Sequence, residues 1–211
     1  MKKIILAIIF IIVFPITILA QKKHNINAGF DFSFGIYYFD SDINNPTAYS
    51  PFIGYEYNLF DFLGLGLGLK YGGFNQRIGY NRTDVIQPPM NPEYLAHDIY
   101  RGTTFSPYIS SKLLFDISRT KSSKYLFLEN RLLYTIAQLN LDRIEGLNGK
   151  KSRNNLDYEV RFGYMHSLND NWVLMCWAGY STFNFSRVDP ENIKFKNSTP
   201  ILIGIGFEYS F

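Results

Sequence analysis

Charged residues stand at every second position of several stretches of this chain. Glu129 and Arg131 have this spacing, and so do Asp157, Glu159 and Arg161. Alternate residues of a strand point to the same face, so these side chains would gather on one side of a sheet. There they could form a proton-linked site or a polar conduit, or they could be ion pairs in a closed interior, where charges must be paired. The residues that share this pattern are Asp31, Glu56, Lys70, Lys112, Glu129, Arg131, Asp157, Glu159, Arg161 and Glu208.

Histidine, serine and cysteine could supply nucleophilic or metal-assisted chemistry. A Ser–His–acid hydrolase needs its three groups within hydrogen-bond reach. His97 and Asp98 have no identifiable serine partner, whereas His166 is followed directly by Ser167. The three histidines and the single Cys176 do not have the spacing of metal ligands. The sequence therefore predicts no metal or cofactor site, and His166 with Ser167 remains the candidate for hydrolysis.

Eight stretches with alternating apolar and polar residues could position these groups as strands. In residues 63–74, leucines alternate with glycines and Lys70, which gives one apolar face and one small or polar face. Each stretch is near the ~9–11 residues that a tilted strand needs to cross a membrane. The expected strands are residues 26–38, 49–59, 63–74, 105–115, 125–139, 156–166, 172–183 and 201–211.

Two of these strands have irregular faces. In residues 125–139, Asn130 would point outward among leucines, which is unfavourable unless a β-bulge intervenes. In residues 172–183 the outward face is ambiguous. We favour the face formed by Trp172, Leu174, Cys176, Ala178 and Tyr180.

The stretch from Ile201 to Phe211 has one wholly apolar face that ends in aromatic residues. In a closed transmembrane barrel such a face would contact lipid, with its aromatics at the interface. Gly206, Tyr209 and the terminal Phe211 resemble the C-terminal strand of Gram-negative outer-membrane barrels. The resemblance implies that these three residues form the signal recognised by the barrel-assembly machinery.

The first residues have the pattern of a secretory signal peptide. Lys2 and Lys3 precede an apolar run of about 16 residues, which is shorter than the ~20 residues of a membrane span. Cleavage is expected after Ala20. The alternative is an uncleaved anchor.

Composition narrows the classes of function. Loss of Lys2 and Lys3 with the leader lowers the formal charge from +3 to +1, and no Lys/Arg block follows, which argues against nucleic acid as a partner. No later segment has 18 or more apolar residues, so a helical membrane protein is excluded. A closed barrel is then the form in which the chain could cross a bilayer.

The connections between the expected strands alternate between tight and long. Residues 58–62, 118–124 and 168–171 are tight, and residues 39–48, 75–104, 140–153 and 184–197 are long. Tight turns on the periplasmic side and long loops outside are typical of outer-membrane barrels. Within residues 75–104, Asn91-Pro92-Glu93 predicts the start of a short helix that continues to about Asp98.

These patterns resemble small eight-stranded outer-membrane barrels of the porin family, such as the OmpA transmembrane domain and OmpX, over nearly all of residues 21–211. The Lys-rich start, the Ala20–Gln21 junction and the aromatic strands also resemble small barrels of Bacteroidetes. The implied fold is all-β, an eight-stranded antiparallel up-and-down transmembrane β-barrel, with residues 1–20 as leader. The implied location is the outer membrane of a Gram-negative cell, in contact with its lipid and lipopolysaccharide.

Three functions are compatible with such a barrel. The favoured one is a structural or surface-interaction protein with an ion-paired lumen and external loops as the contact surface, since loops carry recognition on rigid scaffolds. The second is a lipid A-modifying enzyme. However, His166 ends a strand beside a tight turn, on the side away from the outer leaflet, and its surroundings depart from the His-x-Ser-Asn spacing of deacylase barrels. The third is a narrow channel or a secretion-accessory barrel.

Overall fold

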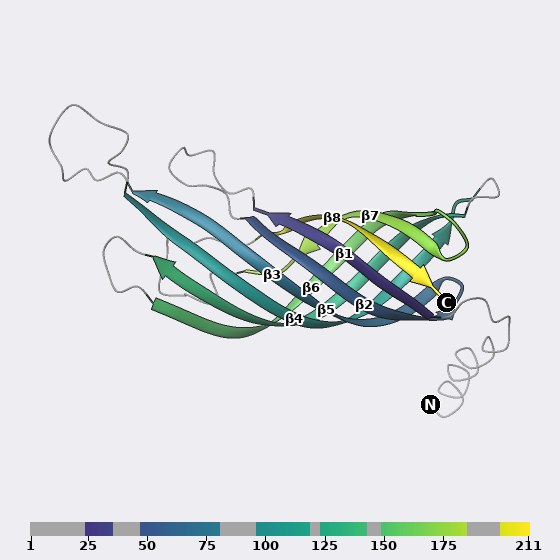
Figure 1. Cartoon of the computed structure of the whole chain (residues 1–211), viewed down its shortest axis with the longest axis horizontal. Helices are drawn as coiled ribbons and strands as arrows, with labels where there is room; N and C mark the ends of the chain where they lie inside the picture. Colours follow the sequence, from purple (N-terminus) through teal and green to yellow (C-terminus); the bar gives the residue numbers. More distant parts are fainter. Residues whose placement is uncertain (1–23, 36–46, 81–95, 119–122, 143–148, 185–198) are drawn as a thin grey trace, which may run out of the picture.

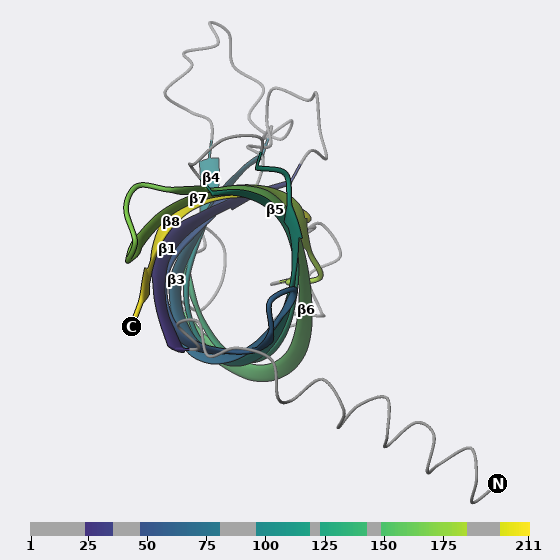
Figure 2. The same ribbon diagram turned by 90° about the vertical axis from the view of Figure 1, so that its right-hand side faces the viewer.

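The protein is a closed β-barrel in which each strand pairs with its neighbour in sequence and β8 returns to β1. A computed structural model describes residues 24–35, 47–80, 96–118, 123–142, 149–184 and 199–211. The expected leader, residues 1–20, lies outside the described residues. All neighbouring strands are antiparallel, and the end-on view shows a complete ring (Figure 2). The strands are β1 (His24–Phe34), β2 (Thr47–Phe60), β3 (Leu63–Tyr80), β4 (Ala96–Asp116), β5 (Lys124–Asp142), β6 (Gly149–Ser167), β7 (Trp172–Ser181) and β8 (Ile201–Ser210).

Alternation of side chains produces this wall. In β1 the inward Asn25, Asn27 and Asp31 are buried, whereas the outward Ile26 and Phe30 are exposed. The other strands follow the same rule, so the outside of the barrel is apolar and the inside is mostly polar. This is the reverse of a soluble barrel and is the arrangement that a lipid environment favours.

The wall is uneven in height. The strands β3 to β6 have 18 to 21 residues, whereas β1, β7 and β8 have 10 or 11. The longer strands extend past the others at the end where the long connections lie, on the left of Figure 1. We call this the loop end, and the opposite end, with the tight connections β2–β3, β4–β5 and β6–β7, the turn end.

The uneven wall corrects the expected loops. Residues 75–80 and 96–104 belong to β3 and β4, and residues 140–142 and 149–153 belong to β5 and β6, although all were expected in long connections. Ala96 to Asp98 pair with β3 and are not helical, while Asn91-Pro92-Glu93 lies outside the described residues. In these parts the strands are continued by backbone hydrogen bonds to their neighbours, although the sequence there has no alternating apolar face. Conversely, β1 ends at Phe34 and β7 at Ser181, earlier than expected.

The tight turns are held by side chains that bind the backbone. Asn169 Oδ1 accepts hydrogen bonds from the amides of Asn171 at 2.9 Å and Trp172 at 2.8 Å. Asp116 Oδ1 accepts one from the Ser118 amide at 2.8 Å. Such local bonds favour a turn over continued strand. They fix the register of the strands that follow.

The two irregular strands have simple explanations. Asn130 pairs with Ser111 of β4 and Val160 of β6 without a shift of register, so no bulge accompanies it. Instead, the Tyr158 hydroxyl donates to Asn130 Oδ1 at 2.5 Å on the outer face. In β7 the favoured face is confirmed, because Trp172, Cys176 and Tyr180 are exposed and the alternate residues turn inward.

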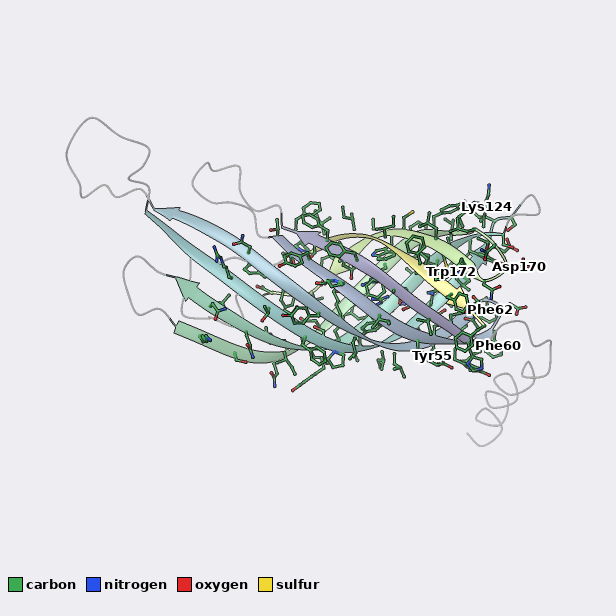
Figure 3. The ribbon with its side chains drawn as sticks, in the orientation of Figure 1. Tyr55, Phe60, Phe62, Lys124, Asp170 and Trp172 are labelled. Atoms are coloured by element: carbon green, nitrogen blue, oxygen red, sulfur yellow. The ribbon has the colours of Figure 1, made fainter. Side chains whose placement is uncertain are left out.

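Aromatic side chains surround the outside of the turn end. Figure 3 labels Tyr55, Phe60, Phe62 and Trp172 there, all at the edge of the wall. Phe60 stacks on Phe62 with centroids 5.4 Å apart. Aromatic belts of this kind are typical of membrane–water interfaces. Within the described part of the chain, no helix has the length and apolar character needed to cross a membrane.

Candidate functional site

The structure places all ten charged residues of the sequence pattern inside the barrel. Each has at most 7% of its surface exposed, and Arg161 has none. Eight strands leave an interior just wide enough for side chains. Charged groups in such a space must find partners, because an unpaired buried charge is strongly destabilising.

The larger group of ion pairs lies in the middle of the lumen and toward the loop end. Lys70 Nζ is 3.0 Å from an Asp31 carboxylate oxygen and 2.5 Å from one of Glu159. Arg161 contacts the same two carboxylates, Asp31 directly and Glu159 at 3.1 Å. Arg131 donates from Nε to Glu129 at 2.8 Å. Arg161 also lies 3.7 Å from a Glu129 oxygen, so these three cations and three carboxylates, from the four strands β1, β3, β5 and β6, form one group.

The smaller group lies nearer the turn end. Lys112 Nζ is 2.6 Å from a Glu56 oxygen and 2.7 Å from a Glu208 oxygen. These residues come from β4, β2 and β8, so a single ammonium joins three strands that surround the lumen. The shared lysine provides attraction to both carboxylates, which would otherwise repel each other.

Aromatic rings and guanidinium groups alternate across the lumen. Arg131 Cζ lies 4.2 Å from the ring centroid of Phe52 and 4.3 Å from that of Tyr108. Arg161 Cζ lies 4.8 Å from the Phe52 centroid and 5.1 Å from that of Trp177. Phe52 is therefore placed between two cations, an arrangement in which desolvated cation–π attraction is strong. We call the series Tyr108, Arg131, Phe52, Arg161 and Trp177 the lumen stack.

Trp177 connects the lumen stack to the ion pairs. Its indole Nε1 donates to Asp31 at 2.9 Å, so this carboxylate accepts a neutral donor as well as Lys70 and Arg161. A buried indole normally finds such a partner. Sequence reasoning identified the charged residues but missed Phe52 and Trp177. Their position in the alternating pattern, on the inward side of each strand, could have identified them.

Each large inward ring lies beside a glycine on the neighbouring strand. Phe52 pairs with Gly29, and Trp177 pairs with Gly204. Tyr108 and Phe127 have the same relation to Gly68 and Gly163. A Cβ added at Gly204 would meet the indole of Trp177, and one added at Gly29 would lie 2.8 Å from the Phe52 ring. The glycines thus provide the space that the rings occupy.

The packed lumen leaves little room for a passing solute. Among the described residues, the space lined by Phe52, Arg131, Arg161 and Trp177 is too narrow to admit a water molecule. Nearer the loop end, a cavity of about 20 Å³ is lined by Lys70, Asp157, Glu159 and hydroxyl groups, which include those of Ser33, Ser50, Thr104, Ser106, Thr135 and Ser181. A cavity of that size holds about one water molecule.

The two histidines whose side chains the structure describes, His24 and His166, lie beside aromatic rings. His166 lies at the turn end of β6 and stacks on Tyr164, with centroids 6.3 Å apart. His24 is the first residue of β1, which begins two residues earlier than the expected strand at residues 26–38, and its Nδ1 is 2.5 Å from the Tyr55 hydroxyl. The side chains of residues 97 and 98 lie outside those described. Within the described residues, no group of three His, Cys, Asp or Glu side chains could hold a metal ion.

The three residues of the expected assembly signal contact the strands on either side of β8, which are β1 and β7. Phe211 stacks on His24 with centroids 5.7 Å apart, and its amide donates to the His24 carbonyl at 3.0 Å. Tyr209 packs against Trp172 at 5.0 Å. Gly206 lies close to β1, where an added Cβ would be 2.7 Å from the Ala28 carbonyl.

Comparisons with known proteins identify the fold. The crystal structure of Neisserial surface protein A matches with a TM-score of 0.54 and 15% identity, over 89% of this chain and 97% of that one. The outer membrane protein OprG from Pseudomonas aeruginosa matches with a TM-score of 0.55 and 12% identity, over 91% and 97%. No protein family and no curated protein matches the sequence. The chain therefore has the fold of small outer-membrane β-barrels, and the narrower resemblance to Bacteroidetes barrels stays a prediction.

Proposed function

We propose that this protein is a non-conducting barrel of the outer membrane with a structural or surface-interaction role. The lumen stack carries the proposal, because alternating rings and guanidinium groups fill the middle of the barrel from wall to wall. The apolar outer face and the aromatic belt support a membrane location. The loop end would face the cell exterior and provide the contact surface.

Passage of ions tests the proposal directly. The purified barrel, inserted into a planar phosphatidylcholine bilayer, should show no steady open state. A variant that opens the lumen, Phe52→Ala with Trp177→Ala, is the comparison, because it removes two rings of the stack. Steady conductance of the unmodified protein would contradict the proposal and favour a narrow channel or a secretion-accessory barrel.

The enzymatic alternative has a separate test. Lipid A from cells with and without the protein should have the same mass spectrum, since the described residues bring no serine and acid together with His166. A lost acyl chain or a new group on lipid A would favour the enzyme. We also infer that the leader is removed after Ala20 and that the barrel-assembly machinery recognises the last strand; N-terminal sequencing of the mature protein tests the former.

A further inference from the structure

We propose that the outer face of β4, β5 and β6 at the loop end binds the phosphate groups of an outer-leaflet glycolipid. This inference depends on the proposed outer-membrane location and names a partner for this side of the barrel. Three observations support it: the polarity of the outer face, the register of the three strands, and the charges that this register aligns.

Polarity changes abruptly along the outer face of these strands. Toward the turn end the outward residues are apolar except for a few such as Ser111 and Asn130, and the last large apolar ones are Phe105, Ile136 and Leu156; Phe105 and Leu156 are exposed. Close to this border the Asn154 amide donates to the Tyr134 hydroxyl at 3.0 Å. A tyrosine with its ring toward the apolar side and its hydroxyl bound to a polar group is typical of a membrane interface.

Beyond the border, the ladder register aligns polar groups in rows across the three strands. Thr103 pairs with Gln138, which pairs with Ser152. Arg101 pairs with Asn140, which pairs with Lys150. Neighbouring side chains in such a row are about 5 Å apart, so Arg101 and Lys150 are separated by roughly 10 Å with an amide between them. We call Arg101, Asn140 and Lys150 the cationic row.

The cationic row is available to a ligand. All three side chains are exposed, and no ion pair or hydrogen bond holds Arg101 or Lys150 in the part of the chain that the structure describes. None of the side chains described beyond the border on this outer face is acidic. The other outward residues there, Thr103, Gln138, Ser152 and Asn154, can all donate hydrogen bonds, and so can Asn75 of β3, which pairs with Arg101.

The height of the row matches a headgroup layer. Arg101 lies four residues beyond Phe105 in β4. At about 3.3 Å per residue and a tilt of about 45°, its backbone is roughly 9 Å above the border along the barrel axis. The headgroup layer of one leaflet is about 5–7 Å thick, and a long arginine side chain can reach back into it. Phosphate is the anionic group there, and arginine binds it with paired hydrogen bonds.

The test compares lipid A with and without its phosphates. The folded barrel is placed in phosphatidylcholine vesicles that contain bisphosphorylated lipid A, or the same lipid stripped of phosphate. Loss of the compact band on a heat-modifiability gel measures stability. Phosphorylated lipid A should raise the midpoint temperature by about 3–5 °C, and phosphate-free lipid A should not.

Charge removal identifies the surface. In the variant Arg101→Gln with Lys150→Gln, half of the maximal shift should require about tenfold more lipid A, because two charge-assisted contacts are lost. The control Lys124→Gln removes a cation at the turn end, where Figure 3 labels it, and should respond like the unmodified protein.

Three results would overturn the proposal. These are an equal response to both forms of lipid A, an unchanged response of the double variant, or an equal shift from soluble pyrophosphate, which would indicate a free anion and not a lipid. Within the described ranges, the part of β6 before Glu159 has no partner in β7 and forms a sheet edge. If the double variant formed oligomers with its lipid response intact, the role of Lys150 would be only to prevent that edge from pairing with another barrel. Failure of the proposed function would appear separately, as steady conductance or absence from the outer-membrane fraction.

Discussion

Arg131 has two kinds of partner in the lumen, a carboxylate and two aromatic rings. Arg131→Ala should lower the free energy of unfolding by about 3–5 kcal/mol, because Glu129 would remain buried without its closest cation. Urea titration in phosphatidylcholine vesicles, followed by intrinsic fluorescence, measures the change. The Arg131→Ala variant should create little or no steady conductance, since Phe52 and Trp177 still fill the lumen.

A paired substitution separates charge from volume in that prediction. The variant Arg131→Met with Glu129→Gln removes both charges and keeps much of the packed volume. It should be more stable than Arg131→Ala, because no carboxylate is left unpaired. If the two variants were equally unstable, the loss would come from the ring contacts, and the ion pair would contribute little to stability.

Gly204 tests the relation between glycines and inward rings. A Cβ at this position meets only Trp177 atoms among its three nearest neighbours. Gly204→Ala should cost about 1–3 kcal/mol of unfolding free energy through overpacking and should change the near-ultraviolet circular dichroism of the indole. The matched control is Gly66→Ala, whose nearest atom is the movable Ser110 hydroxyl; an equal cost for both would contradict the prediction.

For single residues, the sequence predicts which face of a strand a side chain lies on but not which residues it contacts. The inward position of Glu129, Arg131 and Arg161 follows from period-two spacing, which depends only on strand geometry. Their partners do not follow, because Lys70 meets Asp31 and Glu159 only after eight strands have closed and brought β1, β3 and β6 together. The cation–π contacts depend on the same closure.

At the scale of elements, the apolar pattern locates strands but not their full length. It found the part of β4 from Phe105, whereas the strand begins at Ala96. Arg101 and Thr103, which are outward and exposed in this missed part, are polar, so they interrupt the hydrophobic period. Backbone hydrogen bonds to β3 and β5 extend β4 through these residues. Such bonds do not depend on the type of side chain, so the sequence does not show them.

The proposed role of β8 in assembly can be tested at its last residue. Phe211→Asp, or deletion of Phe211, should greatly reduce the yield of folded barrel in the outer membrane, because the residue belongs to the proposed recognition strand and packs on His24. Phe62→Asp is the control, since Phe62 is also an exposed aromatic at the turn end. Similar yield and similar heat-modifiable mobility for both variants would show that Phe211 has no special role.

At the scale of the whole molecule, the inside and outside of the barrel have separate tasks. In the described part of the chain, six buried carboxylates and four buried cations line the lumen, and their mutual contacts stabilise the wall from within. The outer face carries the apolar belt and, at the loop end, the cationic row. Binding groups directed outward and a packed interior favour a protein that interacts at the membrane surface over one that moves solutes.

The orientation of the barrel decides which leaflet the cationic row meets. An even number of strands puts His24 and Phe211 at the turn end, which in outer-membrane barrels faces the periplasm. In a Cys176→Ser background, a cysteine at Asn91, between β3 and β4, should react with an impermeant maleimide on intact cells. A cysteine at Asn169, in the β6–β7 turn, should react only after the outer membrane is opened. The reverse pattern would place the cationic row at the inner leaflet, which would remove the glycolipid proposal and bring His166 to the outer leaflet, where hydrolysis of lipid A would again be an open function.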